Sequence, residues 1–323
     1  MSEKNGVYSA ARIKSICLDA GADDVGLVDL DRDALAEERA GTLQVYPFTR
    51  TVISLAIAHN RENIQSAARY VANEEFQHTR DKTSSLARRI LRRLNRHGIR
   101  GVVVNQEWPM AMDRYPGKLW DVSHKIMAVE AGLGHMGMNR LVLHPEFGSG
   151  IQLESILVNG TMDEYDHPLE ANPCINCNLC AAVCPTGAIT KGQPFDFMAC
   201  LTHTYRDNHI GFNNLIEAVV TSGNMDEYRT HFDDRETAFM WQSLMFGMNY
   251  RCCYCMAVCP AGREAGTLYR EDKRSHVAHI LKPLRDRQER VYVTAGSKAE
   301  ANARRNGNKA VMIVKGIGRP SAD

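Results

Sequence analysis

Apolar and polar positions in the first half of the chain predict buried strands that alternate with helices. Short apolar runs suited to buried strands lie at 24–28, 51–58, 101–104 and 151–158. The segments between these runs have helical patterns instead. This alternation favours a mixed or parallel sheet covered by helices, in an α+β or α/β domain.

The helical segments carry recognisable ends. Ser9 is placed to cap a helix that runs to Ala20, and Gly21 is placed to end it. A long helical stretch is predicted over 63–97, with a break near Thr79. A shorter helix, over 121–131, leads into a glycine-rich turn, and no internal repeat is apparent.

The last turns of the long helix separate apolar residues from basic ones. One face holds Leu86, Ala87, Ile90, Leu91 and Leu94, and the opposite face holds Arg88, Arg89, Arg92, Arg93 and Arg96. Such a charged face is favoured as a solvated surface, and contact with RNA phosphates is the alternative.

Composition excludes several classes of protein. The 323 residues carry 39 Lys+Arg and 38 Asp+Glu, a net charge of +1, which gives no overall attraction to nucleic acid or membranes. With 44% hydrophobic and 24% charged residues, the chain is neither disordered nor collagen-like. No apolar run reaches the roughly 18 residues of a membrane span. The start, Met-Ser-Glu-Lys-Asn-Gly, has no signal core or twin-arginine pair, so a cytoplasmic protein is expected.

Cysteine is the residue type that changes this picture. Nine of the ten cysteines lie between Cys174 and Cys259, and Cys17 is expected to be an ordinary core residue. A disulfide scaffold would be a short secreted chain, which this sequence does not resemble. Clustered cysteines in a reducing compartment indicate a metal site.

The first cysteine run has the spacing C-x2-C-x2-C-x3-C-P and extends from Cys174 to Pro185. This is the spacing of bacterial two-cluster ferredoxins. Three close thiolates bind three iron corners of one cubane, and the fourth thiolate leads to a second cluster. Zinc sites use separated pairs of ligands instead, so iron–sulfur is the favoured interpretation.

A second run, Cys252-x2-Cys255-x3-Cys259-Pro260, supplies three ligands, and the isolated Cys200 can supply a fourth. The assignment that uses every piece is crossed between two [4Fe–4S] clusters. One cluster is expected to be bound by Cys174, Cys177, Cys180 and Cys259, and the other by Cys184, Cys200, Cys252 and Cys255. Cys253 is an alternative ligand that the spacing disfavours.

The predicted organisation is an α/β domain over 1–164 and a dicluster module over 165–265 with an insertion at 201–251. The tail 266–323 is expected to pack back on the N-terminal domain. Because a ferredoxin needs only its cluster module, the preceding 160 or so residues point to a second redox centre.

The turn from Ala131 to Arg140, the segment Pro145-Glu-Phe-Gly148-Ser and the split cluster module together resemble the epoxyqueuosine reductase and reductive dehalogenase superfamily. The resemblance covers roughly residues 8–265. It implies a nitroreductase-like domain that binds a base-off cobalamin, which two [4Fe–4S] clusters reduce.

The glycine turn can also be interpreted from its residues. Glycines let backbone approach a large ligand closely and permit positive φ, whereas a tight connection that needs glycine for its shape is the alternative. The corrinoid-binding residues expected here are Gly132, Gly134, His135, Met136, Gly137, Asn139 and Gly148.

Catalytic residues follow from the resemblance more than from a motif. Tyr70 matches the proton-donating tyrosine of the dehalogenases, and Lys125 lies near the position of its basic partner, with His124 as a rival. A nearby cation would lower the phenol pKa. A buried ring at Tyr70 and a solvated lysine at Lys125 are the alternatives.

The chain departs from the family at one position, because Lys118 occupies the place where epoxyqueuosine reductases carry an acidic proton donor. Their helical-repeat tail for tRNA is not found either. The favoured function is therefore a dehalogenase-like reductase of a small organic substrate, with an external low-potential donor such as a ferredoxin, flavodoxin or reductase. The alternatives are a tRNA-modifying reductase and a ferredoxin-type electron-transfer protein.

Overall fold

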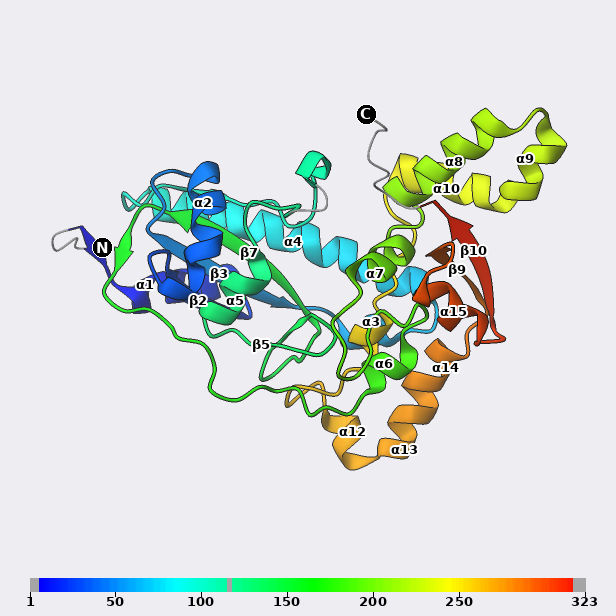
Figure 1. The fold of residues 1–323 in the computed structure, drawn as a ribbon. Helices are drawn as coiled ribbons and strands as arrows, with labels where there is room; N and C mark the ends of the chain where they lie inside the picture. Colours follow the sequence, from blue (N-terminus) through cyan, green and yellow to red (C-terminus); the bar gives the residue numbers. More distant parts are fainter. Residues whose placement is uncertain (1–5, 115–117, 316–323) are drawn as a thin grey trace. The chain divides into compact units, whose positions relative to one another are not determined.

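The computed structural model describes residues 6–114 and 118–315, and its chain divides into two compact units (Figure 1). Unit 1 consists of Met1–Asn60, Glu75–Asn176 and Pro260–Thr267, and unit 2 of Arg61–Glu74, Cys177–Cys259 and Leu268–Asp323. The boundaries expected near 164 and 265 are therefore wrong in detail, because the chain passes between the units more than once.

The main sheet of unit 1 has four strands in the order β2-β3-β7-β4. They are β2 (Asp24–Asp29), β3 (Thr51–Ala58), β7 (Ile151–Val158) and β4 (Gly101–Val103). Every neighbouring pair is antiparallel, so the expected mixed or parallel sheet is wrong. The helix between β2 and β3, α2 (Ala36–Val45), buries only Glu38 and Thr42, so it lacks the apolar stripe of a parallel crossover helix.

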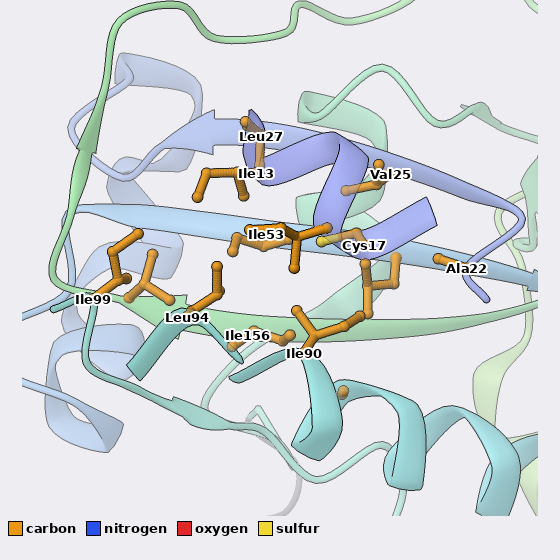
Figure 2. Close-up of a cluster of buried hydrophobic side chains, with 14 of the residues drawn as sticks. Ile13, Cys17, Ala22, Val25, Leu27, Ile53, Ile90, Leu94, Ile99 and Ile156 are labelled. Atoms are coloured by element: carbon orange, nitrogen blue, oxygen red, sulfur yellow. The ribbon is translucent and has the colours of Figure 1, made fainter. Parts of the chain in front are cut away.

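Helices cover both faces of this sheet. On one face, α1 (Ala10–Ala20) and α4 (Arg69–Asn95) pack on the odd-numbered residues of β3, and Figure 2 shows Ile13, Ile53, Ile90 and Leu94 in this core. On the other face, α5 (His124–Glu130) packs Met127 against a second core cluster. The helix ends at Ser9 and Gly21 are confirmed, since Ser9 caps α1 and Gly21 is left-handed.

The long helical stretch is interrupted earlier than predicted. A short helix, α3 (Arg61–Gln65), is followed by α4, which continues unbroken through Thr79. The Thr79 hydroxyl bonds the Glu75 carboxylate one turn earlier at 2.9 Å, so this side chain does not compete for the helix backbone.

The smaller elements of unit 1 form pairs and short turns. They are β1 (Val7–Tyr8), β8 (Thr161–Met162), β5 (His135–Met136), β6 (Val142–Leu143), and the 3₁₀ turns η1 (Asp33–Leu35) and η2 (Met112–Arg114). Strand β1 pairs with β8 in parallel, and β5 pairs with β6 antiparallel.

Unit 2 is mainly helical. Its helices are α6 (Leu179–Val183), α7 (Phe197–Thr204), α8 (His209–Thr221), α9 (Met225–His231), α10 (Asp234–Phe246), α11 (Tyr254–Ala257), α12 (Thr267–Glu271), α13 (Lys273–His276), the π-helical turn η3 (Val277–Leu281) and α14 (Lys282–Arg285). Helices α8 to α10 account for most of the expected insertion at 201–251.

The C-terminal segment folds as β9 (Glu289–Thr294), α15 (Lys298–Arg304) and β10 (Lys309–Val314), with β9 and β10 parallel. This tail belongs to unit 2, and the expectation that it packs on the N-terminal domain remains a prediction. Val291 and Val293 of β9 bury against Ala199 of α7 within unit 2. Within the described residues, no helix is both long enough and apolar enough to cross a membrane.

One buried carboxyl makes the stability of unit 1 depend on pH. Glu154 on β7 is fully buried, and it accepts hydrogen bonds from the Gln106 amide at 2.8 Å and the Ser155 N–H at 3.1 Å. Burial raises the pKa of Glu154 from 4.5 to about 7. The stabilising contribution of the neutral acid is therefore complete below about pH 4.5 and is lost as pH rises through about 7.

We expect Glu154→Gln to remove this dependence. Relative to the variant, the free energy of unfolding of the wild type should fall by roughly 3 kcal/mol between about pH 4.5 and about pH 8. Urea unfolding across this pH range measures the difference, with the exposed Glu37→Gln as control. Parallel pH profiles for wild type and Glu154→Gln would contradict the assignment.

Candidate iron–sulfur site

The two cysteine segments of unit 2 are copies of one another, although no repeat was expected from the sequence. Residues 177–185 read CNLCAAVCP and residues 252–260 read CCYCMAVCP. Each segment has a left-handed residue at its second position, Asn178 with φ 62° and Cys253 with φ 46°. A short helix follows in each case, α6 in the first copy and α11 in the second, and these two helices pack together.

The thiols expected to bind the second cluster lie near one another. Cys184 and Cys200 pack against the same apolar cluster, formed by α7 and β9. Burial raises the pKa of Cys252 and of Cys255 well above the ordinary value, and the charges of Cys184 and Cys200 raise both further. Three separate segments of the chain therefore place these four thiols near one another, and their role as the ligands of one cluster remains a prediction.

This donor set fits an iron–sulfur cluster. None of the ten cysteines, all of which the structure describes, forms a disulfide. Burial and neighbouring charges raise the pKa of the Cys252 and Cys255 thiols, and a bound cation would compensate the charge of their thiolates, which is what iron does. Within the described residues, no three His, Cys, Asp or Glu side chains converge on a single ion position. A cubane does not require such convergence, since each thiolate binds a different iron.

The other predicted ligand set is divided between the units. Cys177, Cys180 and Cys259 belong to unit 2, whereas Cys174 lies in the last residues of the unit 1 segment that ends at Asn176. Its backbone N–H bonds the Asn172 side chain at 2.9 Å. The ligand roles of these four cysteines remain predictions.

A buried carboxylate holds the ligand segment 250–255 in place. Glu289 of β9 accepts hydrogen bonds from the hydroxyls of Tyr250 and Tyr254, at 3.2 and 2.7 Å. These tyrosines stand two residues before and two residues after Cys252. The Lys309 ammonium on β10 balances the charge at 2.8 Å, and both side chains of this ion pair are almost completely buried.

The same network reaches the helix that carries Cys200. His203, one turn later on α7, bonds the Tyr250 hydroxyl through Nε2 at 2.9 Å. Its Nδ1 accepts the Tyr292 N–H of β9 at 3.3 Å, so Nε2 carries the proton. Burial lowers the pKa of His203 to about 3, which keeps the ring neutral. One carboxylate therefore ties together two of the segments that supply thiols.

Further polar contacts fix both ends of this segment. The Asp207 carboxylate accepts the N–H of Asn249 and of Tyr250, each at 2.9 Å. The buried Arg69 guanidinium donates to the Cys252 carbonyl at 3.0 Å. Sequence reasoning missed these residues, and the only local signal was the pair of tyrosines that flank Cys252.

The glycines of the turn in unit 1 lie close to other parts of the chain. A Cβ atom on Gly132, Gly134 or Gly148 would meet the chain's own backbone, at His167, Leu143 and Ala261 respectively, within 2.6 Å. A Cβ on Gly137 would meet the Leu143 side chain at 2.7 Å. These glycines are therefore needed for local packing, and their role toward a corrinoid remains a prediction.

The other residues expected at the corrinoid site also make local contacts. Asn139 is buried and its Oδ1 accepts the Leu141 N–H at 3.3 Å. His135 and Met136 form the short strand β5 and are half-buried. Their role toward a cofactor remains a prediction.

The predicted catalytic residues lie in different units. Tyr70 is in the unit 2 part of α4, and its side chain is 70% exposed, so the alternative of a buried ring is wrong. Lys125 of unit 1 is exposed and donates to the Arg140 carbonyl at 2.9 Å. His124 is bonded at both nitrogens, to Ser155 Oγ at 2.8 Å and the Asn105 carbonyl at 2.9 Å. Burial lowers the pKa of His124, which favours a structural role.

Comparison with known proteins agrees with the iron–sulfur assignment. A family model described as a 4Fe-4S binding domain matches residues 170–190, which contain the first cysteine run. The fold and the paired cysteine segments define a ferredoxin-type iron–sulfur protein with an additional α+β unit.

Two curated relatives and one solved structure show which proteins this chain resembles. An epoxyqueuosine reductase of Bacillus anthracis is 25% identical over 187 residues, 55% of this chain and 41% of that protein. One of Gloeobacter violaceus is 28% identical over 230 residues, 62% of this chain and 67% of that protein. The structure of a reductive dehalogenase for which a B12-dependent mechanism is suggested has a TM-score of 0.53 and 15% identity. The match covers 90% of this chain and 36% of the dehalogenase chain.

The chain is similar to epoxyqueuosine reductases in sequence and shares a fold with a reductive dehalogenase, in agreement with the resemblance noted from the cysteine pattern and glycine turn. It spans less than half the length of the Bacillus anthracis relative. The likeness to the dehalogenase shows a shared fold only, and a nitroreductase-like fold remains a prediction.

The internal repeat predicts the role of Cys253. Because Cys253 stands where the first copy has Asn178, and asparagine tolerates left-handed backbone, Cys253→Asn should keep about eight irons per chain. Cys252→Ser should instead reduce the iron content to about four. Iron and sulfide analysis after anaerobic reconstitution measures both. Full iron in Cys252→Ser, with loss in Cys253→Asn, would reverse the ligand assignment.

The Glu289 network predicts a second effect. Glu289→Gln should leave Lys309 buried without a counter-charge and destabilise unit 2 by about 3 kcal/mol or more, and iron should fall toward four per chain. Glu289→Gln/Lys309→Met should recover part of this stability, because no lone charge is then buried. Thermal unfolding and iron analysis measure these changes, with Glu300→Gln on α15 as control. A single variant as stable as the control would show that the carboxylate does not hold the segment.

Proposed function

We propose that the chain is an iron–sulfur oxidoreductase of the epoxyqueuosine reductase type, which reduces an epoxide on a modified nucleoside of tRNA. The convergence of Cys184, Cys200, Cys252 and Cys255 within unit 2 carries the redox part of this proposal. The names of the curated relatives support the substrate class. The dehalogenase-like reaction favoured from the sequence has weaker support, because only the fold likeness favours it.

The number of electrons that the proposed reaction needs matches the number of predicted clusters. Two-electron reduction of an epoxide takes two electrons and two protons, and bound [4Fe–4S] clusters each pass one electron at a time. The buried side chains of Glu289, Lys309 and His203 hold together the segments that carry Cys200 and Cys252. The electrons come from an external low-potential protein donor, which we also propose.

The proton donor is proposed to be Tyr70. Its side chain is exposed and lies on a regular helix, so the phenol is free to meet a substrate. Lys125 is proposed as the cation that stabilises the phenolate. Lys118 stands where the resemblance places an acidic proton donor, and its ammonium bonds the buried Glu38 carboxylate at 2.6 Å. A corrinoid is proposed on the resemblance alone.

Turnover under anaerobic conditions tests the function. Reconstituted protein, with and without added cobalamin, should reduce a tRNA stem-loop that carries epoxyqueuosine when reduced viologen is the donor. Nucleoside mass spectrometry detects the product. Turnover of halogenated phenols but not of the RNA would support the dehalogenase-like alternative instead, and clusters that reduce without any turnover would support an electron-transfer protein.

Tyr70→Phe tests the proton donor in the same assay. We expect both clusters to be retained and the rate to fall by about 10²- to 10⁴-fold, the usual cost of removing a general acid. Tyr269→Phe is the control. A Tyr70→Phe rate within a few-fold of wild type would exclude the assignment.

A further inference from the structure

A strip of five arginines lies on the solvent face of α4 in unit 1. Arg88, Arg89, Arg92, Arg93 and Arg96, the arginine strip, are all exposed. Residues on the opposite face of the same turns, Leu86, Ala87, Ile90 and Leu94, are buried in the core that Figure 2 shows. The core therefore holds the helix rigidly and presents the arginines outward.

Few acidic residues of the chain balance the positive charge of the strip. No Asp or Glu occurs between Asp81 and Glu107, although the chain as a whole is balanced at 39 basic and 38 acidic residues. Within the described ranges, none of the five arginines forms an ion pair with a carboxylate. Arg89 donates to the Ala20 carbonyl at 3.4 Å, which leaves its charge uncompensated.

Helix stability does not explain this arrangement. Basic residues in the last turn suit the helix dipole, which accounts for Arg92 and Arg93. The pairs 88/92 and 89/93 are like charges four residues apart, however, and such pairs repel each other across one turn. A chain selected only for a solvated surface would mix acids into these positions.

The surroundings of the strip select among anionic partners. A membrane-surface helix needs exposed apolar residues beside its basic ones, and a protein interface needs an apolar centre. Between Tyr70 and Ile175 the described structure has no exposed large hydrophobic residue, and α1, whose Ala20 carbonyl accepts from Arg89, exposes only Leu18 among such residues. A strip of charge alone suits the phosphodiester backbone of a nucleic acid, and the arginine fork binds phosphate oxygens in pairs.

We propose that the arginine strip is a docking surface for the phosphate backbone of the RNA substrate. This proposal rests on the proposed function, which supplies the RNA. With 1.5 Å of rise per residue, the strip is about 12 Å long, with successive arginines of one row about 6 Å apart. It contacts phosphates rather than bases, so it contributes affinity and orientation without sequence preference.

An RNA-binding assay tests the proposed docking surface. Fluorescence anisotropy measures the binding of a fluorescein-labelled, unmodified tRNA transcript to the whole chain over a series of salt concentrations. Arg92→Gln/Arg93→Gln should weaken binding about tenfold or more at low salt. The slope of log Kd against log salt should fall by about 0.7 to 0.9 for each phosphate contact removed. Glutamine keeps the helix propensity, so the fold is retained.

The matched control is Arg304→Gln/Arg305→Gln on the exposed end of α15, which removes the same charge elsewhere. It should change affinity by less than about twofold. Equal weakening by both double variants would show a general charge effect and would overturn the proposal. Unchanged RNA affinity in Arg92→Gln/Arg93→Gln, with loss of binding to phosphatidylserine vesicles, would overturn it in favour of a membrane.

The binding assay is independent of turnover, so the two proposals fail separately. Loss of RNA affinity in Arg92→Gln/Arg93→Gln, in a protein that reduces no epoxide, supports the strip and counts against the proposed function. Normal RNA affinity in that variant, in a protein that does reduce the modified RNA, overturns the strip alone.

Discussion

The cluster site of unit 2 depends on one buried carboxylate. The second set of thiols comes from segments around residues 184, 200 and 252–255, and burial and neighbouring charges raise the pKa of Cys252 and of Cys255. Glu289 bonds Tyr250 and Tyr254 on either side of Cys252, and Lys309 balances the charge of this carboxylate. Breaking a buried ion pair is costly, so this pair stabilises the position of the segment that carries Cys252.

The C-terminal β9-α15-β10 segment supplies the side chains of this ion pair. Its strands supply Glu289, Lys309 and the N–H that orients His203, and its apolar side chains pack on the helix that carries Cys200. The segment therefore packs with the elements that carry Cys200 and Cys252. In unit 1, the core gives α4 a fixed outer face, and the proposed RNA contact uses that face.

Local features were predictable from the sequence, and features that depend on distant residues were not. The strands 51–58 and 151–158 and the ends of α1 follow from apolar runs and capping residues, and the structure has them at those positions. Strands β3 and β7 pair antiparallel. Their relative direction depends on the path that the connecting segments take around the sheet, and no local sequence pattern shows that path. Glu289 lies some forty residues from the tyrosines that it bonds, so no local pattern links them. Likewise, the residue that lies against Gly134 is Leu143, which the pattern of glycines does not reveal.

The most direct test of the central claim is the iron content and EPR spectrum of anaerobically reconstituted Cys200→Ser beside the wild type. Two cubanes give about eight irons and two interacting reduced signals in the wild type, and the variant should retain about four irons and one isolated signal. An iron content of about eight per chain in Cys200→Ser, or a single cluster in the wild type, would contradict the crossed ligand set.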